Sequence, residues 1–410
     1  MAIAVICTGT ELLKGSAVNT NMAYLGRELC AAGIPAVLEL TIGDHPSEIV
    51  SALSFALRSA DTIILSGGLG PTDDDLTLDV AARFFGIELT EDKTLRNKLL
   101  WFWKSRHQGP CPKAQFRQAR VPVNGGYIPN PVGSASGLEF AVEFDSVIRH
   151  VYLLPGPPRE FEPMVKNELL PRLIGNDNKK IFTDGFMVCA GESSVFSPIK
   201  QLLTDVDVEV ACAAGAGGVR MFISGSDENI VKDAVQKAYN SVEYVKLPIG
   251  KFDLNEELLN VLAEKSLHFG CAESCTGGMV ADKIVALPGA SKVFNGGIIA
   301  YANAVKQLQL GVSEEILSSV GAVSKECAEA MARGCCKQLN CECAVATTGI
   351  AGPDGGTAEK PVGLVYIAAV CNEKCVVREL RAHGDRRAVR ERAAAVALQL
   401  MYEVLTGQDA

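Results

Sequence analysis

Hydrophobic and polar positions alternate in short, regular blocks over the first 68 residues. Residues 2–9, 36–43 and 61–68 are short apolar runs that predict strands, and each ends in polar or glycine-rich sequence. The two segments between them, 19–35 and 47–60, carry apolar residues at helical spacing. This order of strand, helix, strand, helix and strand predicts a parallel sheet with helices on both faces.

The pattern changes twice further along the chain. A strand and a proline-rich turn at 152–164 close the first block, and strands and helices then alternate in a compact α+β pattern up to about residue 247. A third block of mixed strands and helices ends in a long helix. We therefore predict a three-layer α/β domain at 1–172, a small α+β domain at 173–250 and a second α/β domain at 251–410.

Length and composition place the chain among globular proteins of several domains. Its 410 residues exceed one ordinary core, and 48% hydrophobic with 21% charged residues is typical of globular domains. The chain has no apolar run of the ~20 residues that a membrane span needs. Its first residues lack the basic segment of a signal peptide, so we expect a cytoplasmic location and no membrane partner.

Charge and cysteine content argue against a nucleic-acid-binding protein and against a structural zinc protein. The net charge is -9, and Lys and Arg are scattered except at 381–392, so we expect no direct nucleic-acid binding. The fourteen cysteines include no Cys-x-x-Cys spacing and the five histidines are dispersed, so we expect no structural zinc site. Most cysteines are expected to be small buried hydrophobes in a reducing compartment.

The segment GGLGPTDDDLT at 67–77 follows the third predicted strand. Its glycines let backbone amides approach a ligand, and Asp73, Asp74 and Asp75 begin a predicted helix. One carboxylate suffices for a helix cap, and three adjacent ones repel each other unless a cation is near. The pattern indicates either a divalent cation with a phosphate ligand or a helix cap alone. Glu11, at the end of the first strand, is either a further ligand on that sheet edge or a helix-entry residue.

The segment AESCTGG at 272–278 offers three side chains for chemistry, Ser274, Cys275 and Thr276. The glycines beside Thr276, at a strand-to-helix junction, form a nest of amides suited to an anion. Cys275 has no histidine in a suggestive motif, so we interpret it as a structural thiol. A serine without a histidine base needs a neutral lysine or a deprotonated tyrosine.

The segment PGASKVFNGGIIAYANAVK at 288–306 contains such a set. Ser291 lies in a loop, Tyr301 follows ten residues later at a strand end, and Lys306 lies five residues further on in the next helix. These side chains can converge on one side of a sheet edge. Alternatively, Tyr301 packs and Lys306 is solvated.

Two segments near the C-terminus add candidate ligand-binding groups. ATTGIAGPDGG at 346–356 ends a strand with two threonine hydroxyls and offers amide donors to a carbonyl oxygen or a phosphate. Arg386, Arg387 and Arg390 begin the last predicted helix, where they oppose its dipole. Their position favours an anionic partner over a cap.

Together these segments resemble the CinA family of competence/damage-inducible proteins over essentially the whole chain. The family patterns TGxELLxG, GGLGPTxDDxT, NPxGxAxG and LPGxPxE stand in order as TGTELLKG, GGLGPTDDDLT, NPVGSASG and LPGPPRE. In the last third, AESCTGG, PGAS, GGIIAYANAVK, GAVS, TGIAGPDGG and KPVG match the family. Any single loop of this kind is explained by ordinary turn chemistry, but the ordered set is not.

The resemblance implies an N-terminal molybdopterin-binding fold with metal-dependent ADP-ribose pyrophosphatase activity, followed by a KH-type domain. It assigns Asp73 and Asp74 to a divalent metal ion, with Glu11 as a further candidate. The residues it implies for the pyrophosphate are Gly67, Gly68, Gly70 and Thr72. The alternative is a pterin- or nucleotide-binding module without hydrolysis.

The last third is similar to nicotinamide mononucleotide deamidase, an amidohydrolase of pyridine nucleotide recycling that yields nicotinate mononucleotide and ammonia. The resemblance makes Ser291 the nucleophile and Tyr301 and Lys306 its activating pair, with no cofactor. The substrate-binding residues it implies are Ser274, Thr276, Gly277, Gly278, Gly296, Thr348, Gly349 and Arg386. It also implies a homodimer with nicotinamide mononucleotide and ADP-ribose as small-molecule partners. The remaining alternative is a competence-related interaction protein with neither activity.

Overall fold

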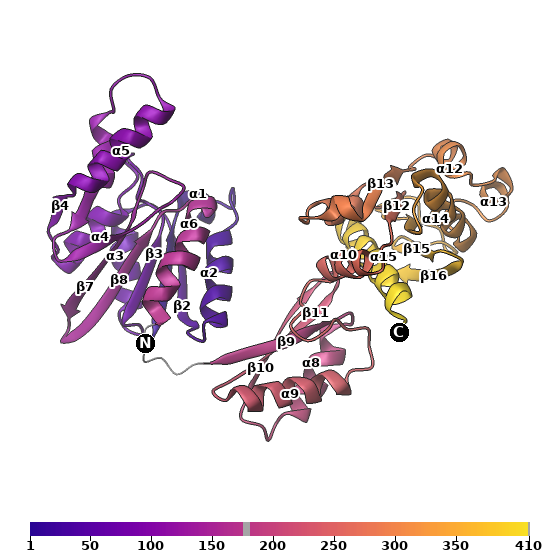
Figure 1. The fold of residues 1–410 in the computed structure, drawn as a ribbon, viewed down its shortest axis with the longest axis horizontal. Coiled ribbons are helices and arrows are strands. Elements are labelled where there is room, and N and C mark those ends of the chain that lie inside the picture. Colours follow the sequence, from indigo (N-terminus) through magenta and orange to yellow (C-terminus); the bar gives the residue numbers. More distant parts are fainter. Residues whose placement is uncertain (175–180, 409–410) are drawn as a thin grey trace. The chain divides into compact units, whose positions relative to one another are not determined.

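A computed structural model describes residues 1–174 and 181–408 and divides the chain into two compact units, Met1–Phe182 and Thr183–Ala410 (Figure 1). Residues 175–180, just after the predicted domain boundary at residue 172, lie outside the described residues. The predicted division into three domains stays a prediction.

The first unit is built on a six-stranded sheet in the order β2-β1-β3-β8-β7-β6. The first four strands of this order pair in parallel, and the last two are antiparallel. The strand bounds are β1 Ile3–Thr8, β2 Ala36–Ile42, β3 Thr62–Ser66, β6 Gly125–Ile128, β7 Gly137–Phe144 and β8 Val147–Leu154. A separate two-stranded sheet pairs β4 Leu89–Glu91 with β5 Arg120–Pro122.

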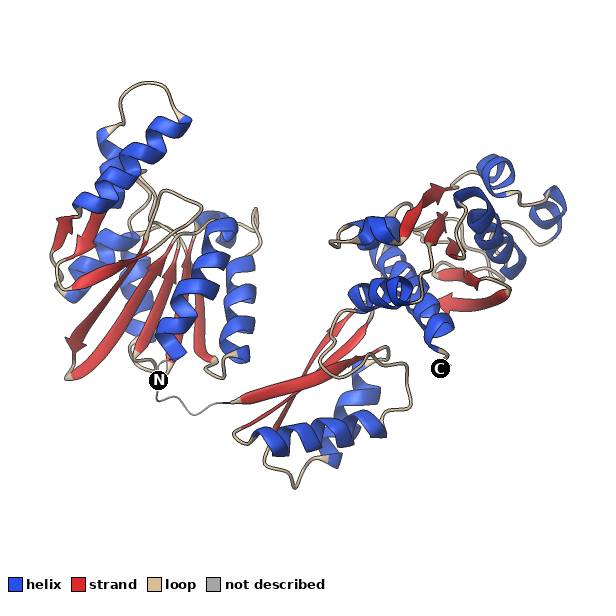
Figure 2. Cartoon of the chain, viewed as in Figure 1, coloured by secondary structure: helices blue, strands red, loops and turns tan. Residues whose placement is uncertain are grey.

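Helices cover both faces of this sheet (Figure 2). They are α1 Thr10–Leu13, α2 Thr20–Ala31, α3 Pro46–Ala56, α4 Thr77–Phe85, α5 Lys93–Arg106, α6 Pro158–Met164 and α7 Leu170–Ile174, with the 3-10 helix η1 Lys113–Ala119 and the π-helix η2 Val165–Leu169. Helix α2 begins where the Asn19 side chain accepts a hydrogen bond from the Met22 amide at 3.1 Å, so Asn19 is its N-cap.

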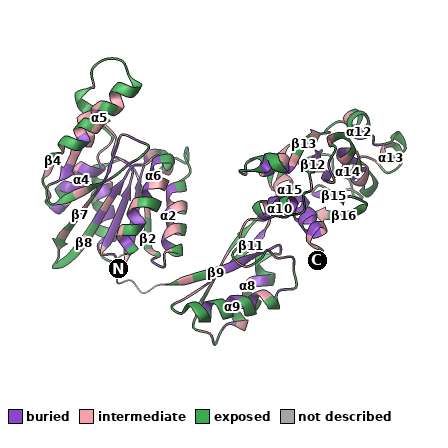
Figure 3. Cartoon of the chain, in the orientation of Figure 1, coloured by how far each residue is buried: buried purple, intermediate pink, exposed green. Residues whose placement is uncertain are grey.

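Alternate residues of the central strands face the two helical layers. Ile6 and Leu65 pack into the core beneath α3 and α4, whereas Val5 and Ile64 pack beneath α2 and α6. Burial on both faces explains why these strands are continuous apolar runs, and Figure 3 shows the central strands as buried. The predicted three-layer α/β architecture of the first unit is confirmed.

The second unit begins with a three-stranded sheet in the order β10-β11-β9. Its elements are β9 Phe182–Val188, α8 Glu192–Leu202, β10 Glu209–Gly215, β11 Gly218–Gly225 and α9 Glu228–Ser241. The final strand predicted for this module is reduced to one bridge between Val188 and Lys246. The module is α+β as expected, and its KH-type assignment stays a prediction.

The rest of the second unit contains a five-stranded sheet in the order β13-β12-β14-β15-β16. Strands β13, β12 and β14 are parallel, and β15 and β16 are antiparallel additions. The strand bounds are β12 Phe269–Glu273, β13 Phe294–Ile299, β14 Cys343–Gly349, β15 Leu364–Cys371 and β16 Lys374–Arg381.

Helices again cover both faces of this sheet. They are α10 Leu254–Glu264, α11 Met279–Val285, the 3-10 helix η3 Ala290–Lys292, α12 Asn303–Leu310, α13 Glu314–Ser319, α14 Lys325–Leu339 and α15 Arg386–Thr406. One core joins α10, α11 and α15 to Val345 and Ile367, and the other joins α12 and α14 to Ala346 and Ala368. This domain is therefore also α/β, as predicted.

Membrane insertion through a helix is not supported for the described part of the chain. No helix within residues 1–174 or 181–408 combines the length and the hydrophobicity that a membrane span requires.

Candidate active site

Three parallel strands of the second unit end at one small polar cavity. Ser274 directly follows β12, Tyr301 follows β13, and Thr348 lies at the end of β14. The carboxyl ends of neighbouring parallel strands share a sheet edge, which is where open α/β sheets bind ligands. The cavity has a volume of about 180 Å³ and is lined by Ser274, Cys275, Tyr301, Asn303, Lys306, Ala322, Val323, Thr348, Gly349, Ala351 and Arg386.

The Lys306 ammonium group is buried at this edge, and its side chain is only 1% exposed. Its Nζ lies 3.0 Å from Ser274 Oγ and donates to the carbonyl oxygens of Ala300 at 2.9 Å and Tyr301 at 3.1 Å. Burial lowers the pKa of Lys306 below its usual value, because it disfavours the charged form. A neutral amine has two N–H donors for the two carbonyls and one lone pair for the serine hydroxyl. The geometry therefore suits a lysine base beside a serine.

The structure does not bring Ser291 to this lysine. Ser291 lies in η3, before β13 begins, whereas Lys306 lies in α12, after β13 ends. A six-residue strand rises about 20 Å, so the two ends of β13 lie at opposite edges of the sheet. Ser291 is exposed and does not line the cavity. The hydroxyl beside Lys306 is that of Ser274, which we had expected only to position the substrate.

Tyr301 binds the Lys306 amine through its backbone carbonyl and not through its phenol. Its carbonyl accepts the lysine hydrogen bond, while its side chain is 64% exposed. The phenol oxygen accepts a hydrogen bond from Arg386 Nη2 at 3.3 Å. The tyrosine therefore lies at the cavity mouth, where it can contact a ligand.

The amide nest of the AESCTGG turn holds an anion of the protein itself. The Glu273 carboxylate, 1% exposed, accepts from the amides of Gly278 at 2.9 Å, Val280 at 3.1 Å and Ala281 at 2.9 Å. A carboxylate at the start of a helix is stabilised by these unpaired amides and by the helix dipole. The sequence indicated an anion here correctly, but a substrate anion is not needed to fill the position.

Four residues of the predicted substrate set lie away from the cavity lining. Thr276 is buried with its hydroxyl 2.7 Å from that of Thr347. Gly277 and Gly278 form the turn that enters α11, and Gly296 lies within β13 opposite Gly270. These four residues therefore shape the strand ends around the cavity and do not line it.

Cys275 lines the cavity but is a poor nucleophile. Its side chain is buried, and burial raises the pKa of the thiol to about 11. The thiolate is therefore rare near neutral pH. The interpretation of Cys275 as a structural thiol agrees with this environment.

Helix α15 supplies arginines with three different surroundings. Arg386 lines the cavity and donates to the Gly352 carbonyl at 2.7 Å. Arg390 donates from Nε to the Cys275 carbonyl at 3.1 Å and from Nη2 to the Thr276 carbonyl at 2.7 Å, which holds the turn after Ser274. Arg387 is exposed and pairs with Glu391 on the surface.

The sequence reasoning missed several residues of the cavity wall. Asn303 is the first residue of α12 and follows Tyr301 by two residues, so its place next to the loop between β13 and α12 was the available signal. Ala322 and Val323 lie in the GAVS segment, and the Ala322 carbonyl accepts from the Thr348 hydroxyl at 2.6 Å. That bond fixes Thr348 at the wall.

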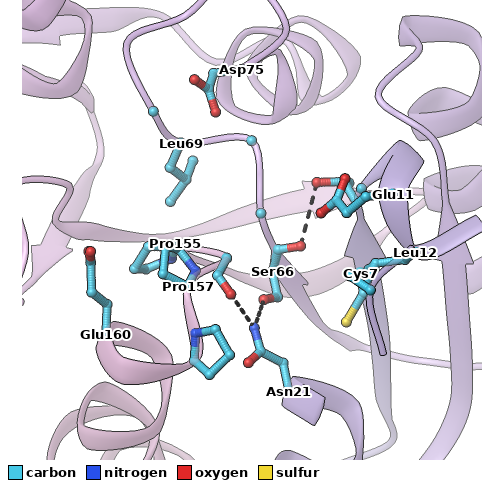
Figure 4. Close-up of a pocket in the computed structure, with 18 of the residues that line it drawn as sticks. Cys7, Glu11, Leu12, Asn21, Ser66, Leu69, Asp75, Pro155, Pro157 and Glu160 are labelled. Atoms are coloured by element: carbon cyan, nitrogen blue, oxygen red, sulfur yellow. Dashed lines mark hydrogen bonds between the residues drawn. The ribbon is translucent and has the colours of Figure 1, made fainter. Parts of the chain in front are cut away.

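The first unit has a larger cavity, of about 520 Å³, at the carboxyl ends of β1, β3 and β8 (Figure 4). Predicted residues that line it are Glu11, Gly67, Gly68, Gly70 and Asp74. Residues that the sequence reasoning missed there include Asn21, Asp44, Gln118 and Glu160. The expected ligand site at this sheet edge is therefore present as a cavity.

The glycine-rich loop uses some of its donors internally. The Gly67 amide donates to the Leu154 carbonyl at 3.0 Å, and the Thr72 amide donates to Asp75 Oδ2 at 2.9 Å. Gly67 has a φ of 107°, and a Cβ there would lie 2.5 Å from the Thr8 carbonyl oxygen. Gly67 and Thr72 were predicted to bind pyrophosphate, but the Gly67 amide ties the loop to the end of β8 and the Thr72 amide bonds within the loop.

The three aspartates of this loop point to different partners. Asp73 is fully exposed and lies 3.5 Å from Arg117, and Asp75 accepts from Thr72. Asp74 lines the cavity together with Glu11. Within residues 1–174 and 181–408, no group of three or more His, Cys, Asp or Glu side chains is placed to hold a metal ion. Asp74 lines the cavity and Asp73 does not, and the assignment of both to a metal ion stays a prediction. Asp74 with Glu11 would fit a cation only if ligand oxygens completed its coordination.

The NPVGSASG and LPGPPRE loops lock together beside this cavity. Asn130 accepts from the Gly133 amide at 2.8 Å, and its Nδ2 donates to Glu160 at 2.8 Å and to the Ala135 carbonyl at 2.7 Å. A Cβ on Gly133 would overlap Glu160 Oε2 and lie 2.7 Å from Asn130 Nδ2.

The change Gly133→Ala is expected to destabilise the chain by about 1–3 kcal/mol, because these buried partners cannot move apart freely. Thermal unfolding of the purified protein measures this loss. Gly26→Ala is the matched control, since Gly26 lies inside α2, where alanine is the better helix former. Equal midpoints for the two variants would show that the loops are not locked.

Comparisons with known proteins match two separate parts of the chain to known families. Residues 4–175 match the family described as probable molybdopterin binding domain, and residues 251–405 match the CinA C-terminal domain. A CinA-like protein of Kosmotoga olearia is 37% identical, covering 99% of both chains. One of Dictyoglomus turgidum is 37% identical, covering 95% of this chain and 96% of the relative. The chain belongs to the CinA family.

Solved structures of this family match parts of the chain. CinA of Thermoplasma acidophilum, a protein with unknown function, is 34% identical, covers 42% of this chain and 97% of its own, and has a TM-score of 0.36. The competence/damage inducible protein CihA of Agrobacterium tumefaciens is 37% identical, covers 37% and 93%, and also has a TM-score of 0.36.

Proposed function

We propose that this chain is an amidohydrolase that converts nicotinamide mononucleotide and water to nicotinate mononucleotide and ammonia. The observation that carries the proposal is the buried contact of 3.0 Å between Lys306 Nζ and Ser274 Oγ at the wall of a cavity. Such a pair activates a serine without histidine. The resemblance to nicotinamide mononucleotide deamidase supplies the substrate.

In the acylation step, neutral Lys306 takes the proton of Ser274 as Oγ attacks the carboxamide carbon. The carbonyl carbon becomes tetrahedral and its oxygen takes the negative charge. The carbon–nitrogen bond then breaks, and the proton held by Lys306 passes to the leaving ammonia. The positive charge of the pyridinium ring makes the carboxamide carbon more electrophilic.

In the second step, water attacks the ester on Ser274 while Lys306 accepts its proton. The carbon–oxygen bond to Ser274 breaks, the proton returns to Oγ, and nicotinate mononucleotide leaves. Atoms balance, since one water enters and one ammonia and one acid leave.

The tetrahedral oxyanion needs free donors, and two amides of the turn at 274–278 are already engaged. The Ser274 amide donates to the Thr347 carbonyl at 3.0 Å, and the Gly278 amide donates to Glu273. We assign the oxyanion to the Thr348–Gly349 end of β14, which lines the cavity. A donor of this kind typically contributes about 3 kcal/mol.

The direct test is ammonia release from nicotinamide mononucleotide by the purified full chain without added metal. Formation of nicotinate mononucleotide in equal amount is expected. A protein that is folded and releases no ammonia would contradict the amidase.

Arg386 is expected to bind the substrate phosphate, because its guanidinium lies at the cavity wall beside the exposed Tyr301. Arg386→Met should raise KM for nicotinamide mononucleotide about tenfold or more, with a smaller change in kcat. Arg387→Met is the matched control, since that arginine is one residue away and pairs with Glu391 on the surface. Equal KM values for both variants would remove Arg386 from the phosphate site.

The first unit is a second candidate site, for metal-dependent hydrolysis of ADP-ribose. The observation that favours it is that Glu11 and Asp74 line one large cavity at a sheet edge. A divalent cation there would polarise the pyrophosphate. Glu11 and Asp74 would hold such a cation, and Asp74→Ala should abolish its product. A pterin- or nucleotide-binding module would form no product with any metal, and an interaction protein would have neither activity.

A further inference from the structure

The five-stranded sheet of the second unit gathers cysteines at the edge opposite the candidate active site. Cys343 is the first residue of β14 and Cys371 the last residue of β15, whereas the cavity lies at the other end of β14, where Thr348 lines it. The seven residues of β14 rise about 20 Å, so the two edges are well separated. Cys336 and Cys341 lie at the end of α14, just before β14 begins. The amidase proposed above uses none of these four thiols.

Cys343 and Cys371 lie directly opposite each other on the antiparallel strands β14 and β15. The Cys343 amide points away from β15 and donates to the His268 carbonyl at 3.0 Å. The bond to β15 is made one residue earlier, where the Asn372 amide donates to the Glu342 carbonyl at 2.8 Å. Cys343 and Cys371 are therefore a non-hydrogen-bonded pair, whose Cα atoms lie about 4.5 Å apart. Disulfides span Cα separations of roughly 4.4–6.8 Å, so a bond between these sulfurs fits the existing backbone.

Cys336 and Cys341 are brought together by the way α14 ends. Asn340 has the left-handed conformation, with a φ of 47°, and the Cys341 amide donates to the Cys336 carbonyl at 3.0 Å. This closure is the Schellman motif, in which the side chains at those same two positions frequently touch. Both are cysteines here, and their thiols share a hydrogen bond. The helix end thus holds a second pair of sulfurs together.

Each pair combines one partly exposed thiol with one buried thiol. Cys371 and Cys336 are partly exposed, whereas Cys343 is 0% and Cys341 8% exposed. In each pair the buried thiol donates a hydrogen bond to its partner, which lowers the pKa of the Cys371 and Cys336 thiols below the usual value. The thiolate is the nucleophile in disulfide exchange, so the more reactive sulfur of each pair is also the accessible one.

The four thiols form two pairs and not a metal site, because no group of three or more His, Cys, Asp or Glu side chains is placed to hold an ion in the described part of the chain. We propose that Cys343 with Cys371, and Cys336 with Cys341, are two sites of reversible disulfide formation by exchange with a small-molecule disulfide. The proposal rests on neither of the two activities proposed above. Both bonds join sulfurs that are already neighbours, so the fold is the same in the reduced and the oxidised chain.

Each bond forms in two exchange steps with one small-molecule disulfide, written RSSR. The Cys371 thiolate attacks one sulfur of RSSR, the sulfur–sulfur bond breaks, and one RS⁻ leaves. The Cys343 sulfur then loses its proton and attacks Cys371 Sγ, which expels the second RS⁻. The two protons of the protein thiols end on the two RSH molecules. Two cysteines are thereby oxidised and one RSSR is reduced, and Cys336 with Cys341 reacts in the same way.

The test is oxidation of the reduced full chain with glutathione disulfide, alkylation of the remaining thiols, and peptide mapping by mass spectrometry without reduction. Cleavage after Lys, Arg and Glu places the members of each pair on different peptides, because Lys337, Glu342 and Glu359 lie between them.

Two linked peptide pairs are expected, one joining Cys343 to Cys371 and the other joining Cys336 to Cys341. Both links should be lost when a phosphine reductant is added. The oxidised chain should also unfold at a midpoint about 5 °C or more above that of the reduced chain, because a disulfide restricts the unfolded chain.

Single serine variants assign each link. Cys371→Ser should abolish the first link and keep the second. Cys336→Ser should do the reverse, which also distinguishes Cys336 from its neighbour Cys335 on the same peptide. Cys375→Ser is the matched control, since Cys375 lies opposite Val370 on β16, and both links should remain.

Three results would overturn the proposal, and each pair is judged by itself. Glutathione bound at Cys371 or Cys336 without a link would show that the paired sulfur does not reach it. A link in another combination, such as Cys336 with Cys371, would show that the pairs are wrongly assigned. Alkylation of both members of a pair after the oxidation would show that the pair does not react. The unmodified chain gives each of these results, so the test does not depend on the folding of a variant.

Discussion

Ser274→Ala is expected to lower kcat/KM for nicotinamide mononucleotide at least about a thousandfold, whereas Ser291→Ala retains most of the activity. The reason is that Ser274 Oγ lies 3.0 Å from the buried Lys306 amine, while Ser291 lies in η3 at the other end of β13. Steady-state ammonia release by the two variants, side by side, measures this difference.

The two serines form a matched pair for that experiment, since each change removes one hydroxyl within the same domain. Unfolding midpoints close to that of the unmodified protein show that both variants are folded. Loss of activity with Ser291→Ala and not with Ser274→Ala would restore the assignment that the sequence alone favoured.

The amidase activity is expected to fall as pH falls through the folded-state pKa of Lys306. Only the neutral amine can accept the Ser274 proton, and burial lowers the pKa of Lys306 from its ordinary value of 10.5. The rising limb of the profile of kcat/KM against pH should therefore have its midpoint below 10.5. Lys306→Met should be inactive at every pH, with a loss comparable to that of Ser274→Ala.

The lowered pKa of Lys306 also makes the stability of the folded state depend on pH. Between the folded-state pKa and 10.5, the unfolded chain binds a proton at Lys306 that the folded chain does not. Stability from this group therefore rises with pH across that window, and denaturant unfolding at several pH values detects it. The rise in stability should be absent in Lys306→Met.

For the activity, a rising limb of kcat/KM with its midpoint at or above pH 10.5 would mean that Lys306 is not the base.

The strands near the start of the chain were predictable because burial on both sheet faces leaves a continuous apolar run. The pattern of 2–9, 36–43 and 61–68 corresponds to β1, β2 and β3. By contrast, α5 and the short strands β4 and β5 were missed. Helix α5 buries only Leu95 and Leu99, so its apolar periodicity is weak, and a three-residue strand carries almost no pattern.

The surroundings of Lys306 were predicted in part, and the difference has a physical cause. Lys306 was identified because a lysine after a strand end can be desolvated, but its partner was sought nearby in sequence. Parallel strands bring together residues that follow different strands, so the hydroxyl came from the end of β12, 32 residues earlier. Ser291 precedes β13, and this order already placed it at the opposite edge. The role of Glu273 was missed because a buried carboxylate breaks the apolar pattern of its strand.

The carboxylate of Glu273 makes the turn that carries Ser274 independent of any bound molecule. The amides that enter α11 are neutralised from within the chain, so the proposed nucleophile is held in place before substrate arrives. In the proposed amidase, binding energy is then not spent on ordering this loop, and the site is preorganised for attack. Buffer anions such as sulfate should accordingly compete at the mouth of the cavity beside Arg386 and leave the turn that carries Ser274 unaffected.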